Sequence, residues 1–284
     1  MNKKPSKFII YTSNFTGVHI PVIENLIINR IEITCIIYEK KLSQKISLSE
    51  KIKTIFRRWG DPRLIPFYLE YKNNINKYIR PRQIHSIKAR SDKNYNLNEF
   101  NNLDDLCERH KIKLFNINDL NSDECIEIQE KFKPDFGIAL ASRILKKEIF
   151  SIPYHGTINL HSMLLPKYKG LSPVGFRETI AGEKFCGIHI HFIEPSLDTG
   201  PIISSEFINL ANHKFCLESI GNEAIDISGP LMVKAINKIL NGAEGTPQAT
   251  SLKNKIYKMP TKKEMLEFYK IKTKRLFKIC SRRC

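Results

Sequence analysis

The fold class follows from residues 8–38, FIIYTSNFTGVHIPVIENLIINRIEITCIIY. Phe8–Tyr11 is a short β-branched and aromatic run, which predicts a strand. In residues 19–29, Ile20, Ile23, Leu26 and Ile27 follow helical spacing, and residues 31–38 return to a β-branched run. The segment therefore predicts a strand, a helix and a second strand in succession.

The same alternation continues to residue 240. Further strands are predicted at 113–115, 136–140, 187–193 and 201–207, and an extended run at 152–160 leads into His161. Helices are predicted at 103–110, 122–132, 172–181 and 217–240, the last with a break near Gly229-Pro230. Strands that alternate with helices indicate an α/β fold with a Rossmann-like, mostly parallel sheet.

Two segments depart from this pattern. Residues 41–97 contain Trp59, further aromatic residues and many basic ones, and a structureless loop of that length is uncommon inside a compact domain. We therefore expect a helical, basic insertion, whose aromatic residues either pack it onto the body or stack on bases. Residues 246–284 are expected to form a short basic extension with one amphipathic helix around 261–269.

The composition is that of an ordinary globular chain, with 42% of its 284 residues hydrophobic and 26% charged. No apolar run approaches the roughly 18 residues that a membrane-spanning helix needs, and no signal peptide is apparent. We therefore expect a cytoplasmic protein without a membrane span. The seven cysteines are odd in number and include no C-x-x-C pair, which argues against a disulfide scaffold and a zinc site.

The net charge of +17 is concentrated in two segments. Residues 41–93 and residues 251–284 each carry a net charge of +10, whereas the rest of the chain carries −3. A polyanion could dock on the two basic segments while the chemistry happens elsewhere. The alternative is a solvated surface in a chain that is rich in lysine throughout.

The residues that carry chemistry lie between 159 and 200. Asn159 and His161 are two residues apart, so both side chains point to the same side of an extended chain. Two such donors can converge on a carbonyl oxygen that becomes tetrahedral. Asp198 lies in a tight turn that follows a predicted strand, and open α/β sheets bind ligands at the carboxyl ends of strands. Together the three side chains could transfer protons and stabilise charge on an acyl group.

Several ordered motifs in this region resemble one family. Asn159-Leu160-His161 is followed by Leu164-Leu165-Pro166 and Lys169-Gly170, and Leu197-Asp198-Thr199-Gly200 comes about forty residues after the first motif. This order resembles the signature of the 10-formyltetrahydrofolate-dependent formyltransferases, which include methionyl-tRNA and sugar-nucleotide formyltransferases. The resemblance implies the formyltransferase fold, with a catalytic domain at 1–245 and the basic extension at 246–284.

The resemblance also implies roles for individual residues. Asn159 and His161 would stabilise the oxyanion that develops when an amine attacks the formyl carbon on N10 of the folate. Asp198 would position the imidazole, or a water, that removes the amine proton. No metal is implied. The donor, 10-formyltetrahydrofolate, would place its pterin against the backbone of two segments, namely Ala141, Ser142, Arg143, Ile144 and Leu145, and Glu194, Pro195, Ser196, Leu197 and Asp198.

The chain departs from the family pattern at a few positions. Met163 stands where a serine is usual before Leu-Leu-Pro, and Arg143 and Lys146 stand where small or apolar residues and proline are usual. His189 and His191 share a face of a predicted strand, but the sequence supplies no third ligand for a metal. His191 leads into the Asp198 turn and is the better candidate to face the site.

The acceptor is left open. An amino-sugar nucleotide is slightly favoured, because methionyl-tRNA formyltransferases carry a further β-barrel domain for which the final 34 residues are too few. The charge of +17 favours methionyl-tRNA instead. Two other functions stay possible: a basic protein that binds RNA or a membrane surface without turnover, and a 10-formyltetrahydrofolate hydrolase with water as acceptor. The intact trio of Asn159, His161 and Asp198 argues against the binding protein.

Overall fold

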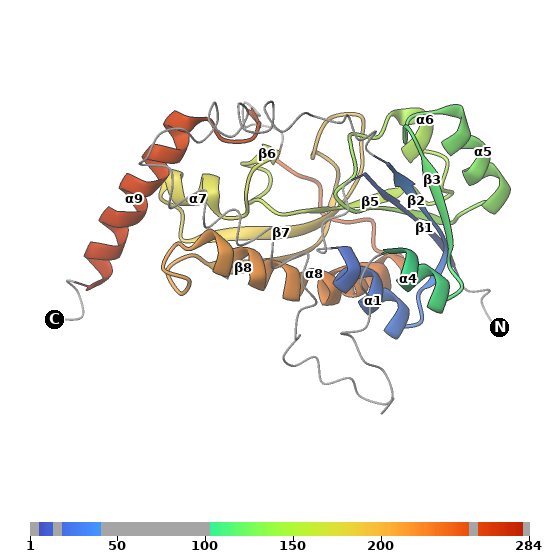
Figure 1. Ribbon diagram of the computed structural model, residues 1–284, viewed down its shortest axis with the longest axis horizontal. Helices are drawn as coiled ribbons and strands as arrows, with labels where there is room; N and C mark the ends of the chain where they lie inside the picture. Colours follow the sequence, from blue (N-terminus) through green and yellow to red (C-terminus); the bar gives the residue numbers. More distant parts are fainter. Residues whose placement is uncertain (1–5, 14–18, 41–102, 250–254, 281–284) are drawn as a thin grey trace, which may run out of the picture. The chain divides into compact units, whose positions relative to one another are not determined.

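The computed structural model describes residues 6–13, 19–40, 103–249 and 255–280, which form two compact units. The first unit contains residues 6–13, 19–40 and 103–157, and the second contains residues 158–249 and 255–280. Figure 1 shows both units in the colours of the sequence. The insertion predicted at 41–97 lies outside the described residues.

The first unit is built around a parallel sheet. Its strands are β1 (Lys7–Thr12), β2 (Glu32–Glu39), β3 (Lys113–Ile117) and β4 (Phe136–Ala139). They lie in the order β3-β2-β1-β4, and every pairing is parallel. All four residues of β4 and five of the six in β1 are buried, as expected for strands covered on both faces.

Helices cover both faces of this sheet. They are α1 (His19–Ile28), α4 (Leu103–Arg109), α5 (Asp123–Phe132) and α6 (Lys147–Phe150). Figure 1 shows α1 and α4 on one side of the strands and α5 and α6 on the other. A buried hydrogen bond of 2.6 Å from the Tyr11 hydroxyl to Gln129 Oε1 links β1 to α5. The α/β class and the parallel sheet predicted from the sequence are therefore confirmed.

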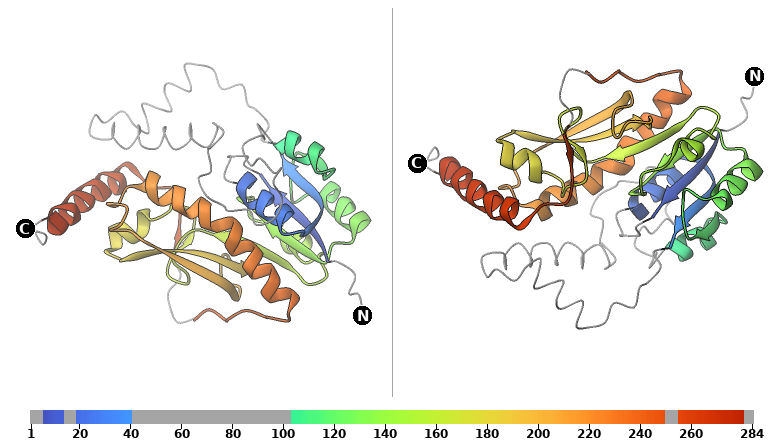
Figure 2. Two further views of the ribbon diagram at one scale, coloured as in Figure 1. Left: turned by 90° about the horizontal axis from the view of Figure 1, so that it is seen from below. Right: turned by 90° about the horizontal axis from the view of Figure 1, so that it is seen from above.

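The second unit contains antiparallel strands. β5 (Thr157–His161) pairs with β7 (Phe185–Phe192), and β7 pairs with β8 (Ile202–Asn209). The long helix α8 (Leu217–Leu240) runs along β7 and β8 (Figure 2). Two short strands, β6 (Lys169–Gly170) and β9 (Ile256–Tyr257), pair in parallel.

The helix α9 (Lys262–Cys280) packs against α7 (Phe176–Ala181). Phe268 stacks on Phe176 with ring centroids 4.9 Å apart, and both side chains are fully buried. The buried Arg177 pairs with Glu264. The predicted helix at 261–269 is therefore present, and it is longer than expected because its apolar side rests on α7.

Two predicted helices differ from the structure. α8 passes through Pro230 without the predicted break, and residues on both sides of the proline, including Ile225, Met232 and Ile236, are buried. Packing along the helix thus outweighs the backbone hydrogen bond that proline removes. α7 begins at Phe176 rather than at 172, because Gly175 adopts a left-handed φ of 77° just before it.

Four cysteine side chains, those of Cys35, Cys107, Cys125 and Cys186, are buried thiols, and burial raises the pKa of each to about 12. None of the helices in the described part of the chain has both the length and the hydrophobicity to cross a bilayer.

Candidate active site

The strand register in the second unit places four polar side chains together. Asn159 lies opposite His191, and His161 lies opposite His189, across the antiparallel pair of β5 and β7. Residues two apart on a strand share a face, so the predicted i, i+2 relation of Asn159 and His161 holds. His161 and His191 are buried, with centroids 6.1 Å apart.

Asn159 is oriented by His191. The Nδ1 of His191 lies 2.7 Å from the carbonyl oxygen of Phe192, which can only accept a hydrogen bond, so Nδ1 carries the proton. Nε2 is then an acceptor, and the Asn159 Nδ2 amide donates to it at 3.2 Å. Burial lowers the pKa of His191 well below its usual range, which keeps the ring neutral and this acceptor available.

His161 has one nitrogen engaged and one directed at Asp198. Its Nε2 lies 3.0 Å from the carbonyl oxygen of Tyr168, so Nε2 carries a proton. Its Nδ1 lies 3.6 Å from Asp198 Oδ2, which is longer than a hydrogen bond but within ion-pair range. Nδ1 is therefore the nitrogen of His161 that can gain or lose a proton beside a carboxylate.

Asp198 faces both histidines from the turn between β7 and β8. Its Oδ1 lies 3.7 Å from His191 Nε2, and its Oδ2 accepts a 2.8 Å hydrogen bond from the Gly170 backbone N–H. The residue is only 9% exposed and has a left-handed φ of 53°. The structure thus brings Asp198 to His161 directly and to Asn159 through His191.

The buried Lys169 adds charge near this group. It precedes Gly170 in β6, and burial lowers the pKa of its ammonium while the Asp198 carboxylate opposes that shift. The turn residues Glu194, Pro195 and Ser196 are exposed, and Leu197 is half-buried.

The loop at 162–166 is held by two side chains on neighbouring elements. Glu178 of α7 accepts a 2.8 Å hydrogen bond from the Leu164 N–H, and burial raises the pKa of this carboxyl to about 7. His189 Nε2 accepts from the Leu165 N–H at 3.2 Å, and its Nδ1 donates to Ser205 Oγ at 2.8 Å. Burial lowers the pKa of His189 to about 3. His189 therefore binds the loop through Nε2 and β8 through Nδ1.

No group of three histidine, cysteine or acidic side chains suited to a metal occurs among the residues that the structure describes. Both ring nitrogens of His189 and both ring nitrogens of His191 form hydrogen bonds with other atoms of the protein.

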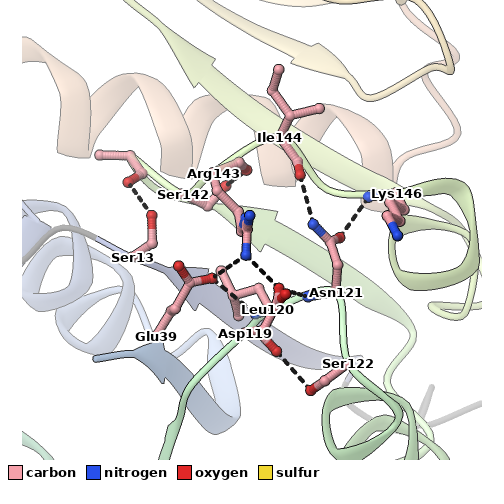
Figure 3. A network of polar contacts seen from close by, with 11 residues as sticks. Ser13, Glu39, Asp119, Leu120, Asn121, Ser122, Ser142, Arg143, Ile144 and Lys146 are labelled. Atoms are coloured by element: carbon pink, nitrogen blue, oxygen red, sulfur yellow. Dashed lines mark hydrogen bonds and ion pairs between the residues drawn. The ribbon is translucent and has the colours of Figure 1, made fainter. Parts of the chain in front are cut away.

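The segment 141–145, predicted to bind the donor, belongs to the first unit and is tied down by a polar network (Figure 3). The Asn121 side chain donates to the Ile144 carbonyl at 3.0 Å and accepts from the Lys146 N–H at 2.7 Å. Arg143 pairs with Asp119 at 2.5 Å and with Glu39 at 3.4 Å. Side chains at the end of β2 and just after β3 therefore bind this loop.

The exposure of this loop suits ligand contact. Ile144 is 71% exposed, whereas Leu145 is buried and anchors the loop in the core of the unit. Ala141 has a left-handed φ of 43°, and its carbonyl accepts from Ser13 Oγ at 3.4 Å. Ser142 Oγ donates to the Arg143 carbonyl at 2.9 Å.

Two residues of the site, Gly170 and Gln248, were not anticipated from the sequence, and His191 was anticipated only as the better of two histidines to face it. His191 had a signal, since it shares a strand face with His189 and precedes the Asp198 turn. Gly170 lies in the quoted Lys169-Gly170 motif, but nothing in the sequence indicates that its N–H binds Asp198. Gln248, whose side chain donates to the Asp198 carbonyl at 3.1 Å, carried no signal at all.

Comparison with known proteins gives a family and several relatives. A family model described as formyl transferase matches residues 74–236, which is more than half of the chain. The chain is 39% identical over 134 residues to a methionyl-tRNA formyltransferase of Clostridium tetani, covering 46% of this chain and 43% of that protein. A methionyl-tRNA formyltransferase of Thermodesulfovibrio yellowstonii is 36% identical over 138 residues, covering 48% of this chain and 42% of that protein. The matches thus span about half the length of these curated relatives.

Solved structures show the same fold. A phosphoribosylglycinamide formyltransferase from Bacillus halodurans has a TM-score of 0.53 at 16% identity, covering 84% of this chain and 97% of its own. A formyltetrahydrofolate deformylase from Pseudomonas syringae has a TM-score of 0.56 at 14% identity, covering 86% of this chain and 66% of its own. At these identities the likeness extends to the fold and no further.

Proposed function

Because this chain belongs to the formyl transferase family, we propose that it is an enzyme that moves a formyl group from 10-formyltetrahydrofolate to an amine. One observation carries the proposal: the Asp198 carboxylate lies within 4 Å of both His161 and His191. Asn159 joins the group through its hydrogen bond to His191. An amide donor, a titratable imidazole and a carboxylate are the groups that acyl transfer requires.

The proposed reaction exchanges one carbon–nitrogen bond for another. The amine nitrogen attacks the formyl carbon, a C–N bond forms, and the carbonyl π electrons move onto the oxygen. The carbonyl then re-forms as the bond to N10 of the folate breaks. The amine loses one proton in the exchange, and N10 gains one.

Asn159 is suited to stabilise the charge on the formyl oxygen. Its amide nitrogen carries two hydrogens, and His191 accepts one of them. The second hydrogen stays available for the oxyanion. His191 therefore fixes the direction of a donor whose position has to be set before the reaction.

His161 and Asp198 are suited to move the amine proton. A proton that arrives at His161 Nδ1 creates an imidazolium whose other nitrogen already donates to the Tyr168 carbonyl. The carboxylate 3.6 Å away stabilises that positive charge. The Gly170 N–H keeps the same carboxylate oxygen in place.

We assign the folate donor to main-chain groups of residues 141–145 and 194–197, as the family resemblance implies. A pterin edge alternates hydrogen-bond donors and acceptors in the way that a peptide does. The exposed Ile144 side chain and the loop held by Asn121 are consistent with a preformed contact for the flat face of the pterin ring. We also assign catalysis to residues 1–245 and treat 246–284 as the extension.

The acceptor amine is proposed in two forms. The curated relatives are named methionyl-tRNA formyltransferases, which makes methionyl-tRNA the first acceptor to test. Exposed lysines on α9, among them Lys262, Lys263, Lys270 and Lys274, supply positive charge for such a polyanion. An amino-sugar nucleotide is the second acceptor, because its diphosphate also pairs with basic residues and the relatives match over only about half their length.

A folate assay tests the proposal. The full chain is incubated with 10-formyltetrahydrofolate and each acceptor, and loss of the formyl group from the folate is followed by absorbance. Turnover that depends on methionyl-tRNA or on an amino-sugar nucleotide supports transfer and identifies the acceptor. Turnover in water alone supports a hydrolase, and no turnover combined with salt-sensitive RNA binding supports a binding protein.

A further inference from the structure

The chain that follows residue 245 runs beside the turn that carries Asp198. Thr246 and Ile202 exchange two backbone hydrogen bonds of 2.8 and 2.7 Å. Two residues further on, the Gln248 side chain donates from Nε2 to the carbonyl oxygens of Asp198 at 3.1 Å and of Gly200 at 2.8 Å. A single amide nitrogen therefore binds the backbone at both ends of the Asp198–Gly200 segment.

The same stretch of chain also holds the other partner of Asp198. β9 pairs with β6, so that Tyr257 lies beside Gly170, and the Tyr257 carbonyl accepts from the Leu171 N–H at 2.9 Å. Gly170 has a φ of 96°, and a Cβ atom there would lie 2.3 Å from the Tyr257 oxygen. Only glycine fits this approach. In this backbone conformation the Gly170 N–H donates to Asp198 Oδ2.

Contacts with α7, and the packing of α9 on α7, fix β9 to the body of the second unit. The buried Arg177 donates to the Lys258 carbonyl at 2.7 Å and lies over the Tyr257 ring at 4.9 Å. The stack of Phe268 on Phe176 anchors α9 on the same helix that carries Arg177. The two contacts with the Asp198 region, one from Gln248 and one from β9 through Gly170, thus both come from the part of the chain that follows residue 245.

We infer that Gln248 is a positioning residue for Asp198, and that the start of the C-terminal extension, residues 246–249, is a working part of the active site rather than an appendage. The inference rests on the proposed function, in which Asp198 acts beside His161. Asp198 adopts a left-handed backbone conformation that is uncommon for residues other than glycine. The two bonds from Gln248 hold that turn, and the Gly170 N–H then sets the direction of the carboxylate.

The test compares Gln248→Met with a matched control, Arg275→Met. Methionine keeps the length of the glutamine side chain, is shorter than the arginine side chain, and removes the hydrogen-bond donors of both. Arg275 also lies in the extension and also donates to backbone carbonyls, those of Thr179 and Glu183 at 3.2 and 2.7 Å. Its partners belong to α7 and the residues just after it, so a loss of stability alone would affect both variants.

We expect Gln248→Met to lower kcat by about 10- to 100-fold with the donor KM within about twofold, as for a small misplacement of a catalytic group. Arg275→Met should keep kcat within about twofold of the wild type and lower the Tm. Gln248→Asn, which is one methylene too short to reach both carbonyls, should fall between the wild type and Gln248→Met. An unchanged kcat in Gln248→Met, or equal losses in both methionine variants, would overturn the inference.

Hydrogen exchange gives a readout that does not need turnover. Peptides covering residues 196–201 should exchange faster in Gln248→Met than in the wild type and in Arg275→Met. Unchanged exchange there would overturn the positioning role even if activity fell. Failure of the proposed function looks different: the wild type would then show no formyl transfer, or Asp198→Asn would keep the wild-type rate, while the exchange result would still stand.

Discussion

Asn159 and His191 face each other across β5 and β7, and the Asn159 amide donates a 3.2 Å hydrogen bond to the unprotonated Nε2 of His191. The proton of that ring lies on Nδ1, because Nδ1 contacts the carbonyl oxygen of Phe192. A buried, neutral histidine thus sets the orientation of the amide that would stabilise an oxyanion. The relationship makes His191 part of the candidate site, which the sequence had indicated only by its place before the Asp198 turn.

The first prediction concerns this hydrogen bond. His191→Phe keeps a buried aromatic ring and removes the acceptor, so Asn159 loses its fixed orientation. We expect kcat to fall by about 10- to 100-fold with little change in the donor KM, measured by steady-state folate deformylation. His213→Phe is the control, since His213 bonds to Ser219 and Glu223 instead. Equal rates in both variants would remove His191 from the site.

The second prediction concerns the proton-transfer pair. Asp198→Asn and His161→Ala should each lower turnover by about 10²- to 10⁴-fold, because the imidazolium loses its counter-charge or is absent. Folate binding, measured by fluorescence titration, should persist, because the donor contacts are assigned to main-chain groups. Asp123→Asn, at an exposed position of α5, controls for the substitution itself. A near-normal rate in either variant would show that its assigned role is wrong.

The third prediction concerns the donor loop. Asn121→Ala removes both bonds that connect its side chain to the loop, one to Ile144 and one to Lys146. Each hydrogen bond contributes about 1 kcal/mol, less where water competes, so we expect the donor KM to rise about 3- to 10-fold. The kcat should stay unchanged, because the catalytic trio is untouched.

The control for the donor loop is Asn209→Ala. Asn209 accepts a local hydrogen bond from the Ala211 N–H in the second unit. A rise in donor KM for this variant as well would mean that the effect does not come from the 141–146 loop.

The fourth prediction concerns stability and pH. Burial lowers the pKa of His189 to about 3, far below the usual 6.5. Below pH 6.5 His189 binds a proton in the unfolded chain but stays unprotonated in the folded chain. His189 therefore lowers the free energy of unfolding of the wild type as the pH falls. The stability advantage of the wild type over His189→Gln should shrink by up to about 1.4 kcal/mol per pH unit between pH 6.5 and 4.

Urea unfolding of both proteins at pH 7.5, 6.5, 5.5 and 4.5 measures this difference. Comparing the two proteins is necessary because burial raises the pKa of Glu178 to about 7, which has the opposite effect on the wild-type curve. That contribution is common to both proteins and cancels in the difference. A difference that stays constant over this range would contradict a neutral, buried His189.

The sequence by itself determined the local structure and the family. Runs of β-branched residues and helical spacing located β1, α1 and β2, and the ordered motifs from Asn159 to Gly200 indicated the family that comparison later confirmed. Spacing also placed Asn159 and His161 on one face of a strand, because alternation along a strand is a local property. The predicted break of the helix near Pro230 was wrong, because the sequence shows only the local effect of proline on the backbone. The packing of α8 against β7 and β8, which keeps the helix continuous, is a long-range effect.

Only the tertiary structure decided what surrounds Asp198. The pairing of β5 with β7 brings His191 to Asn159, and the turn after β7 brings Asp198 to both histidines. Gln248 reaches the same turn from fifty residues away. Such contacts depend on long-range burial and on strand register, and a chain read one segment at a time contains no signal for either, because its side-chain pattern records only which face of an element is covered.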